Sequence, residues 1–377
     1  MFKDVIGQAP VKRHLVEMVH GNRLSHALLF LGPEGSGALP LALAFAQFVF
    51  CENPKETDAC GVCPPCQKAR QLIHPDIHYS YPVIPKKAGD KPVSADYSAE
   101  WREFVAQYPY GNTYDWLQFI GAENKQGNIT AQECNDIIHK LSLKSFESGY
   151  KILIMWMPEY LGNEGNKLLK LIEEPPANTL FLLVAENESL ILPTILSRTQ
   201  LVKIPLPETA DIEQALIERA GLEPGKARQT AVLCEGNYHE ALQLIRHAEE
   251  DWQGVLREWL NAILKNGPIA QVKWIEEISK SGRERQKQFL RYFDHILEQA
   301  VRLRFIEGEG VPIPEGERDF ALRLNKIADI GQQKAIIEEL DRAAYYIERN
   351  AHAKMLFHAL TIKIYHILAD KKLMVVN

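Results

Sequence analysis

The sequence has no apolar run long enough to cross a bilayer, because its longest run, Leu39–Phe50, falls well short of the ~20 residues that a membrane helix needs. It also has no strong excess of one charge. A formal net charge of −6 over 377 residues provides no overall attraction to nucleic acid or to an anionic membrane. The opening residues, Met1–Val5, lack the features of a signal peptide. We therefore expect a cytoplasmic protein with no membrane partner.

Cysteine is scarce outside one short segment. Four of the six cysteines, Cys51, Cys60, Cys63 and Cys66, lie together there, which argues against a secreted disulfide framework. Cys-x-x-Cys steps with turn-forming glycine and proline between them favour tetrahedral zinc–thiolate ligation. Because four thiolates leave no open position for water, we expect a structural zinc ion. A redox pair, or a site that has lost its metal, is the alternative.

The stretch Leu28–Ala44 has the outline of a phosphate-binding loop without its chemistry. A buried strand at Leu28–Leu31 leads into the glycine loop Gly32–Gly37 and then into an apolar helix. In a working loop a lysine and a serine or threonine come next, whereas here Ala38 and Leu39 stand there. Backbone amides could still attract an anion, but we expect no functional ATP site in this chain. The degenerate loop positions are Gly32, Gly35, Gly37 and Ala38.

Apolar patterning divides the chain into an α/β part and an all-α part. Nearly continuous apolar strands such as Tyr150–Met157 and Thr179–Ala185 alternate with helices, which predicts a parallel sheet covered on both faces. After Pro205–Pro207 only helical periodicity recurs. Residues 83–128 differ, with aromatics at helical spacing from Trp101 onward. We interpret them as a local insertion that packs its own aromatics; a base-stacking surface is the alternative.

Three smaller patterns give local predictions. Thr130 followed by Glu133 predicts a capping box at a helix start. Asn166–Ile172 predicts a helix that ends near Glu174, because proline disfavours helical geometry in the residue before it. Long apolar helical faces recur near the C-terminus, at Ile347, Met355, Leu356, Leu360, Ile364 and Leu368.

Several segments together resemble the clamp-loader branch of the AAA+ proteins. The resemblance covers residues 1–82 and 128–242, whereas residues 83–127 have no counterpart in it and the C-terminal third fits by architecture only. The segments that carry it are the opening Phe2…Val5-Ile6-Gly7-Gln8, Arg23–Ala27, the four-cysteine spacing, Asn166–Lys170 with Glu173–Pro176 (similar to "NALLKTLEEPP") and Ile195–Thr199 (similar to "ILSRC").

Departures from the family pattern point to one class within it. Trp156 and Met157 stand where the family's ATPase subunits have Asp-Glu, and His239 stands where their lid domain has an arginine. With the loop lysine also absent, the pattern resembles the non-hydrolysing delta-prime class of bacterial clamp-loader subunits. The family's serine–arginine pair survives as Ser197-Arg198. The resemblance implies that Arg198 is an arginine finger, which acts in trans on ATP bound to a neighbouring subunit.

The resemblance also implies an architecture and partners. The expected domains are an AAA+ core over 1–206, a small helical lid over 207–248 and a helical collar over 249–377; a zinc module at about 51–66 and the aromatic insertion at about 83–128 lie within the core. Implied partners are ATPase subunits of the gamma/tau type and a delta-type subunit, with a sliding clamp and primer-template DNA reached through the complex. The alternatives are an ATP-hydrolysing gamma/tau-type subunit, and a non-replicative AAA+ scaffold or DNA-binding zinc protein.

Overall fold

The computed structural model describes residues 1–87, 89–122, 125–147, 149–246, 251–305, 315–348 and 351–369. The chain separates into two compact units, Met1–Arg246 and a second unit from residue 247 onward. The boundary expected between 248 and 249 lies outside the described residues. None of the helices in the described ranges is both long enough and apolar enough to cross a membrane.

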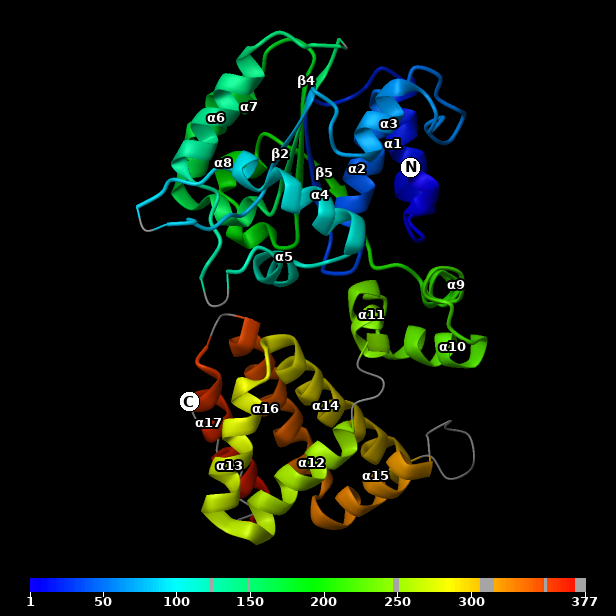
Figure 1. Ribbon diagram of the computed structural model, residues 1–377. Helices are drawn as coiled ribbons and strands as arrows, with labels where there is room; N and C mark the ends of the chain where they lie inside the picture. Colours follow the sequence, from blue (N-terminus) through cyan, green and yellow to red (C-terminus); the bar gives the residue numbers. More distant parts are fainter. Residues whose placement is uncertain are drawn as a thin grey trace. The chain divides into compact units, whose positions relative to one another are not determined.

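The first unit is built on one five-stranded sheet (Figure 1). The strand order is β2-β3-β4-β1-β5 and every neighbouring pair is parallel, which confirms the expected parallel sheet. The strands are β1 (Ala27–Leu31), β2 (Ile77–Ser80), β3 (Lys151–Trp156), β4 (Thr179–Ala185) and β5 (Gln200–Lys203).

Helices cover both faces of this sheet (Figure 1), and three further helices, α9 to α11, come after its last strand in the chain. Figure 1 shows α1, α2 and α3 on one side of the sheet and α6, α7 and α8 on the other. The helical elements are η1 (Phe2–Asp4), α1 (Ala9–His20), α2 (Ala38–Val49), α3 (Pro64–Arg70), η2 (Ser94–Tyr97), α4 (Ser98–Gln107), α5 (Thr113–Phe119), α6 (Ala131–Ser142), η3 (Pro158–Leu168), α7 (Leu169–Glu173), η4 (Glu188–Leu190), α8 (Pro193–Leu196), α9 (Thr209–Ala220), α10 (Pro224–Leu233) and α11 (Tyr238–Arg246).

Alternation along each strand creates two cores, one on each face of the sheet. In β1, Leu28 and Phe30 belong to the core beneath α1 and α2, while Ala27 and Leu29 belong to the core beneath α6. Successive side chains of a strand point to opposite faces, so a strand buried on both faces must be apolar throughout. This is why the strands could be recognised as continuous apolar runs.

Two local predictions need correction. The Thr130 hydroxyl accepts the backbone N–H of Glu133 (3.1 Å), which is half of the expected capping box. The Glu133 carboxylate does not return the bond but accepts the N–H of Ser94 (2.7 Å), since that buried amide has to be satisfied. The helix expected over 166–172 is 3₁₀ as far as Leu168 and α-helical only in α7.

The aromatic insertion packs into the sheet as well as on itself. Trp101 of α4 stacks on Tyr81 (ring centroids 4.1 Å apart) and meets Trp116 of α5 edge-on (5.3 Å). Trp156 is the last residue of β3. Its ring centroid lies 5.2 Å from that of Trp101 and 6.1 Å from that of Phe104. The expectation that the insertion packs its own aromatics was therefore incomplete, because a core tryptophan belongs to the same cluster.

The regular elements in the described residues of the second unit are all helices, as expected. Its core is aromatic: Trp259 stacks on Trp274 (4.8 Å), and both contact Phe289 and Phe357. Of the C-terminal apolar faces, Ile347, Leu360, Ile364 and Leu368 are buried in this core, while Met355 is exposed. Its elements are α12 (Trp252–Asn261), the π-helical η5 (Ala262–Asn266), α13 (Gly267–Lys280), α14 (Arg283–Phe305), α15 (Glu315–Ile327), α16 (Ile330–Glu348) and α17 (Ala353–Ala369).

Replacing Trp156 with Ala should destabilise the first unit strongly, because the indole connects the sheet to the insertion. Loss of a buried tryptophan costs about 3–5 kcal/mol of unfolding free energy. Chemical denaturation followed by circular dichroism measures the loss. Phe146→Ala is the control, since that ring is 81% exposed and should change little. Similar effects of the two changes would contradict this account of the aromatic cluster.

Candidate functional site

The glycine loop connects β1 to α2 and has the backbone conformation its sequence suggests. Gly35 (φ +76°) and Gly37 (φ +85°) both lie in the left-handed region that favours glycine. Ala38 begins α2 and is buried, and Leu39 belongs to the core beneath α2. A methyl group therefore occupies the lysine position, and an apolar core side chain occupies the position of the Mg²⁺-binding hydroxyl.

Two side chains from elsewhere in the unit cover this loop. A Cβ on Gly37 would lie 2.9 Å from Cε1 of Tyr110, and a Cβ on Gly35 would lie 2.0 Å from Oδ1 of Asn237. The glycines thus permit close approach of the insertion and of the residue before α11. The Tyr110 hydroxyl also accepts the backbone N–H of Ile6 (2.8 Å), which fixes the ring over the loop.

Little space remains between the loop and its cover. The cavity there has a volume of about 30 Å³, and its lining includes the loop, Tyr110, Trp156, Met157 and Glu186. A single water needs roughly 10–15 Å³ by the same measure, so this cavity has room for about two waters. Trp156 and Met157 are both buried and provide neither a metal ligand nor a base.

A buried histidine links the loop to α5 and α11. Nδ1 of His239 lies 3.0 Å from Oε1 of Glu34 in the loop, and its Nε2 lies 2.7 Å from Oδ2 of Asp115. The His239 side chain is only 4% exposed. Burial lowers its pKa, but the hydrogen bonds to Asp115 and Glu34 outweigh burial and raise the pKa to about 10. At neutral pH the ring is therefore an imidazolium between two carboxylates.

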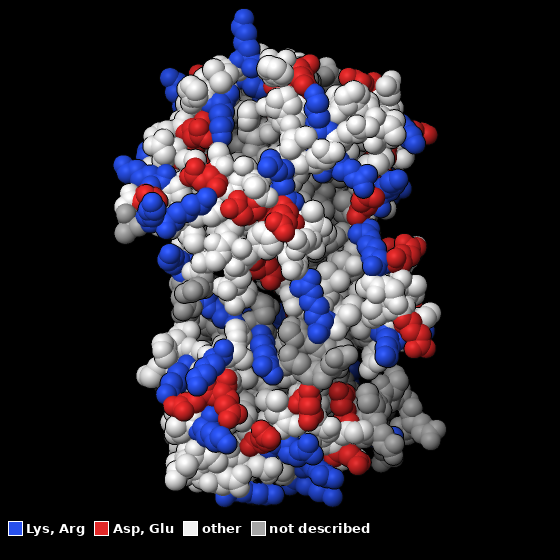
Figure 2. Space-filling view, viewed as in Figure 1, with Lys and Arg blue, Asp and Glu red and all other residues white. Residues whose placement is uncertain are grey.

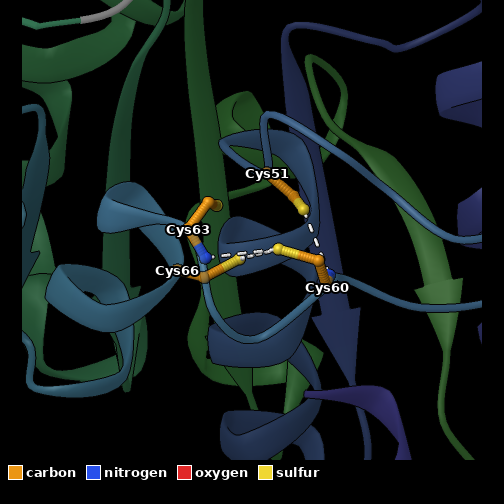
Figure 3. Close-up of side chains that lie close together, drawn as sticks. All are labelled: Cys51, Cys60, Cys63 and Cys66. Carbon is orange, nitrogen blue, oxygen red and sulfur yellow. Dashed lines mark hydrogen bonds between the residues drawn. The ribbon is translucent and has the colours of Figure 1, made fainter.

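The four clustered cysteines converge as the spacing predicts (Figure 3). They come from the loop after α2 and the start of α3, and their sulfur atoms all lie within 4.8 Å of one another. Tetrahedral zinc with bonds of about 2.3 Å needs sulfur atoms about 3.8 Å apart, so a small contraction would complete the site. The four residues could therefore hold a metal ion.

Backbone amides around the cysteines favour the thiolate form. The Cys60 amide donates to the sulfur of Cys51 (3.1 Å), and the amides of Val62 and Cys63 donate to the sulfur of Cys60 (3.5 and 3.4 Å). The latter two bonds lower the pKa of Cys60 to about 6. Burial raises the pKa of the Cys66 thiol. A bound dication would lower that pKa again, because metal coordination deprotonates a thiol ligand.

Arg198 lies after α8, apart from the cavity over the loop. Its Nε and Nη2 donate to Oε2 of Glu173 (3.1 and 2.9 Å), and its Nη1 donates to the carbonyl of Thr194 (3.0 Å). The Ser197 hydroxyl is 3.4 Å from Nη1. The arginine side chain is 32% exposed and the glutamate 58%, so this is a surface ion pair at the edge of the unit.

Charge is mixed on the one face of the molecule that Figure 2 draws. On the face drawn in Figure 2, Lys and Arg side chains are interspersed with Asp and Glu, in keeping with the small net charge. The family model described as DNA polymerase III, delta subunit, matches residues 7–208.

The chain belongs to the DNA polymerase III delta-subunit family.

Curated relatives of the family confirm the delta-prime class expected from the sequence. The delta-prime subunit of Pseudomonas aeruginosa is 29% identical over 213 residues, which are 56% of this chain and 53% of that protein. The delta-prime subunit of Bacillus subtilis is 28% identical over 242 residues, 64% of this chain and 60% of that protein. The tau subunit of B. subtilis is 25% identical over 291 residues, 74% of this chain and 43% of that protein. The chain thus spans about half to three-fifths of the length of the delta-prime relatives.

The structure brings some of the predicted site residues together and adds residues that the sequence did not predict. The four cysteines meet, and Ala38, Trp156 and Met157 line one cavity. Sequence reasoning missed Tyr110, Asn112 and Asp115, because their partners lie far away in the chain and no spacing connects them. His239 alone carried a signal, as an imidazole in place of the family's lid arginine.

The His239 imidazolium should make the stability of the first unit depend on pH. Its folded pKa of about 10 exceeds the ordinary value of 6.5, so its stabilisation is complete below pH 6.5 and is lost as the pH rises through about 10. Denaturation midpoints at pH 7 and pH 10 should differ more for wild type than for His239→Gln, which cannot titrate. Parallel losses in both proteins would show that the imidazolium does not contribute.

Proposed function

We propose that this chain is a non-hydrolysing, delta-prime-type subunit of a DNA polymerase III clamp loader. It completes a ring with gamma/tau-type ATPase subunits and a delta-type subunit, in the cytoplasm, and contributes an arginine finger while the ring loads a sliding clamp on primed DNA. Its parts are an AAA+ core over 1–206, a lid over 207–248 and a collar over 249–377. The observation that carries the proposal is a glycine loop that has Ala38 and Leu39 in place of its catalytic groups and that Tyr110 and Asn237 cover.

Three groups needed for hydrolysis are replaced at once in this chain. Ala38 replaces the lysine, Trp156 with Met157 replaces the acidic pair, and His239 replaces the lid arginine. The replacements are built into the fold, since Trp156 belongs to the aromatic cluster and His239 to a buried ion pair. A gamma/tau-type hydrolysing subunit is the second candidate, because the tau match covers 74% of this chain. That candidate requires a lysine and an acidic pair that this sequence lacks.

Arg198 is the residue with which this chain would act on a neighbour. Its planar fork of donors matches phosphate oxygens, and a partly exposed position at a domain edge lets the side chain reach outward. The competing reading is a surface arginine in a local ion pair, and Glu173 does provide such a pair. Exposed pairs contribute only about 0–1 kcal/mol, so exchanging Glu173 for a phosphate is energetically feasible.

Arg198→Ala should leave folding and assembly intact but lower the ATPase and clamp-loading rates of a reconstituted complex. The finger of one site contributes roughly 10³-fold or more to that site's rate. The total rate falls less, because other sites keep their own fingers. Arg198→Lys should restore little, since a point charge does not make the bidentate contact.

Glu173→Gln is the matched control for Arg198. It weakens the local ion pair without removing the guanidinium, so a finger role predicts unchanged or higher rates. Unchanged rates for Arg198→Ala in a confirmed complex would contradict the finger role and leave a purely structural subunit.

We also propose that Cys51, Cys60, Cys63 and Cys66 bind structural zinc. Cys63→Ser should release the metal and lower the melting temperature, because ligation is part of the folding free energy of such a module. Cys134→Ser is the control, because that buried cysteine lies in the other core and should keep the metal. Metal analysis of protein purified without chelators measures both. Well under one equivalent in the wild type would contradict zinc binding.

A further inference from the structure

The segment Tyr110–Asp115 of the insertion contacts three separate parts of the first unit. Tyr110 accepts a hydrogen bond from Ile6 near the N-terminus and covers Gly37 of the loop. Its ring also meets Tyr238, the first residue of α11, edge-on at 4.9 Å. One short segment therefore joins the chain start, the glycine loop and α11.

Polar contacts reinforce the same junction. The Asn112 amide donates to Oε2 of Glu34 (3.1 Å), while the other oxygen of Glu34 faces His239 (3.0 Å) and the Asn237 amide (3.4 Å). Asp115 approaches the opposite ring nitrogen of His239. The loop is thus connected to α11 through His239 and Asn237, and to the insertion segment through Asn112.

We propose that Tyr110–Asp115 is an internal ligand of the glycine loop, which takes the place of a nucleotide and holds α11 in one position against the core. The inference rests on the proposed function and deepens it. A subunit that binds no nucleotide must hold its lid helices in one position against the glycine loop by other contacts. Only then is Arg198 presented to a neighbour from a rigid subunit. The insertion would provide those contacts at all times.

The charges at the site match such a substitution. A nucleotide would bring anionic phosphates between the loop and a cationic lid residue. Here the Asp115 carboxylate is the anion that faces the lid cation, His239. Glu34 places a second carboxylate inside the loop itself. Because like charges repel, these two carboxylates disfavour a phosphate beside His239.

Hydrogen exchange of the isolated, full-length chain tests the proposal. Asp115→Asn keeps the shape of the side chain and removes the charge that faces His239. We expect exchange in α11 and in the loop to accelerate by about tenfold or more, as for a segment released from a local contact. Exchange in β3 and β4 should stay unchanged. Glu103→Gln, an exposed change on α4 of the same insertion, is the matched control and should alter neither.

Two outcomes would overturn the proposal. One is unchanged exchange of α11 both in Asp115→Asn and in the double variant with Tyr110→Leu. The other is acceleration in β3 and β4 as large as in α11, which would make the segment part of the global fold. Either result leaves the arginine finger untouched, because that role is measured separately with Arg198→Ala in the assembled complex.

Discussion

The arrangement around the glycine loop depends on one buried cation, the imidazolium of His239 between Glu34 and Asp115. Desolvation penalises all three charges; their close mutual contacts offset the penalty, together with the hydrogen bonds that Asn112 and Asn237 donate to the carboxylates. Removing one partner of such a group typically costs about 3–5 kcal/mol, because the remaining charge stays buried without compensation. The cation therefore specifies how three distant segments meet: the loop, the insertion and α11.

The indole of Trp156, at the end of β3, also specifies which segments pack together. A carboxylate at that position would need water, metal or cationic partners, whereas Trp156 needs apolar neighbours, and the insertion provides them in Trp101 and Phe104. The C-terminal end of β3 is thus apolar core in this chain. One position cannot hold both a carboxylate and an indole that packs on the insertion. The lack of an acidic pair after β3 and the presence of the aromatic insertion are therefore connected.

Much of the fold was predictable because its signals are local. Apolar strands buried on both faces, the glycine loop and the cysteine spacing are properties of short stretches, and the structure has them where the sequence indicates. The site was less predictable. The contacts of Asp115 with His239 and of Tyr110 with Gly37 join residues far apart in the chain, and no periodicity encodes them. Glu133 illustrates the same limit, since a tertiary partner, Ser94, replaced the local capping bond.

Together these features support the proposal of a subunit whose glycine loop is covered by its own side chains and whose Arg198 acts on a neighbour's nucleotide. Titration of the full-length chain with a fluorescent ATP analogue in the presence of Mg²⁺ tests this claim most directly. A gamma/tau-type subunit in the same buffer serves as the positive control. The account predicts no saturable binding at concentrations that saturate the control. Binding of one equivalent of the analogue with comparable affinity would contradict it, because the loop would then have to open for a nucleotide.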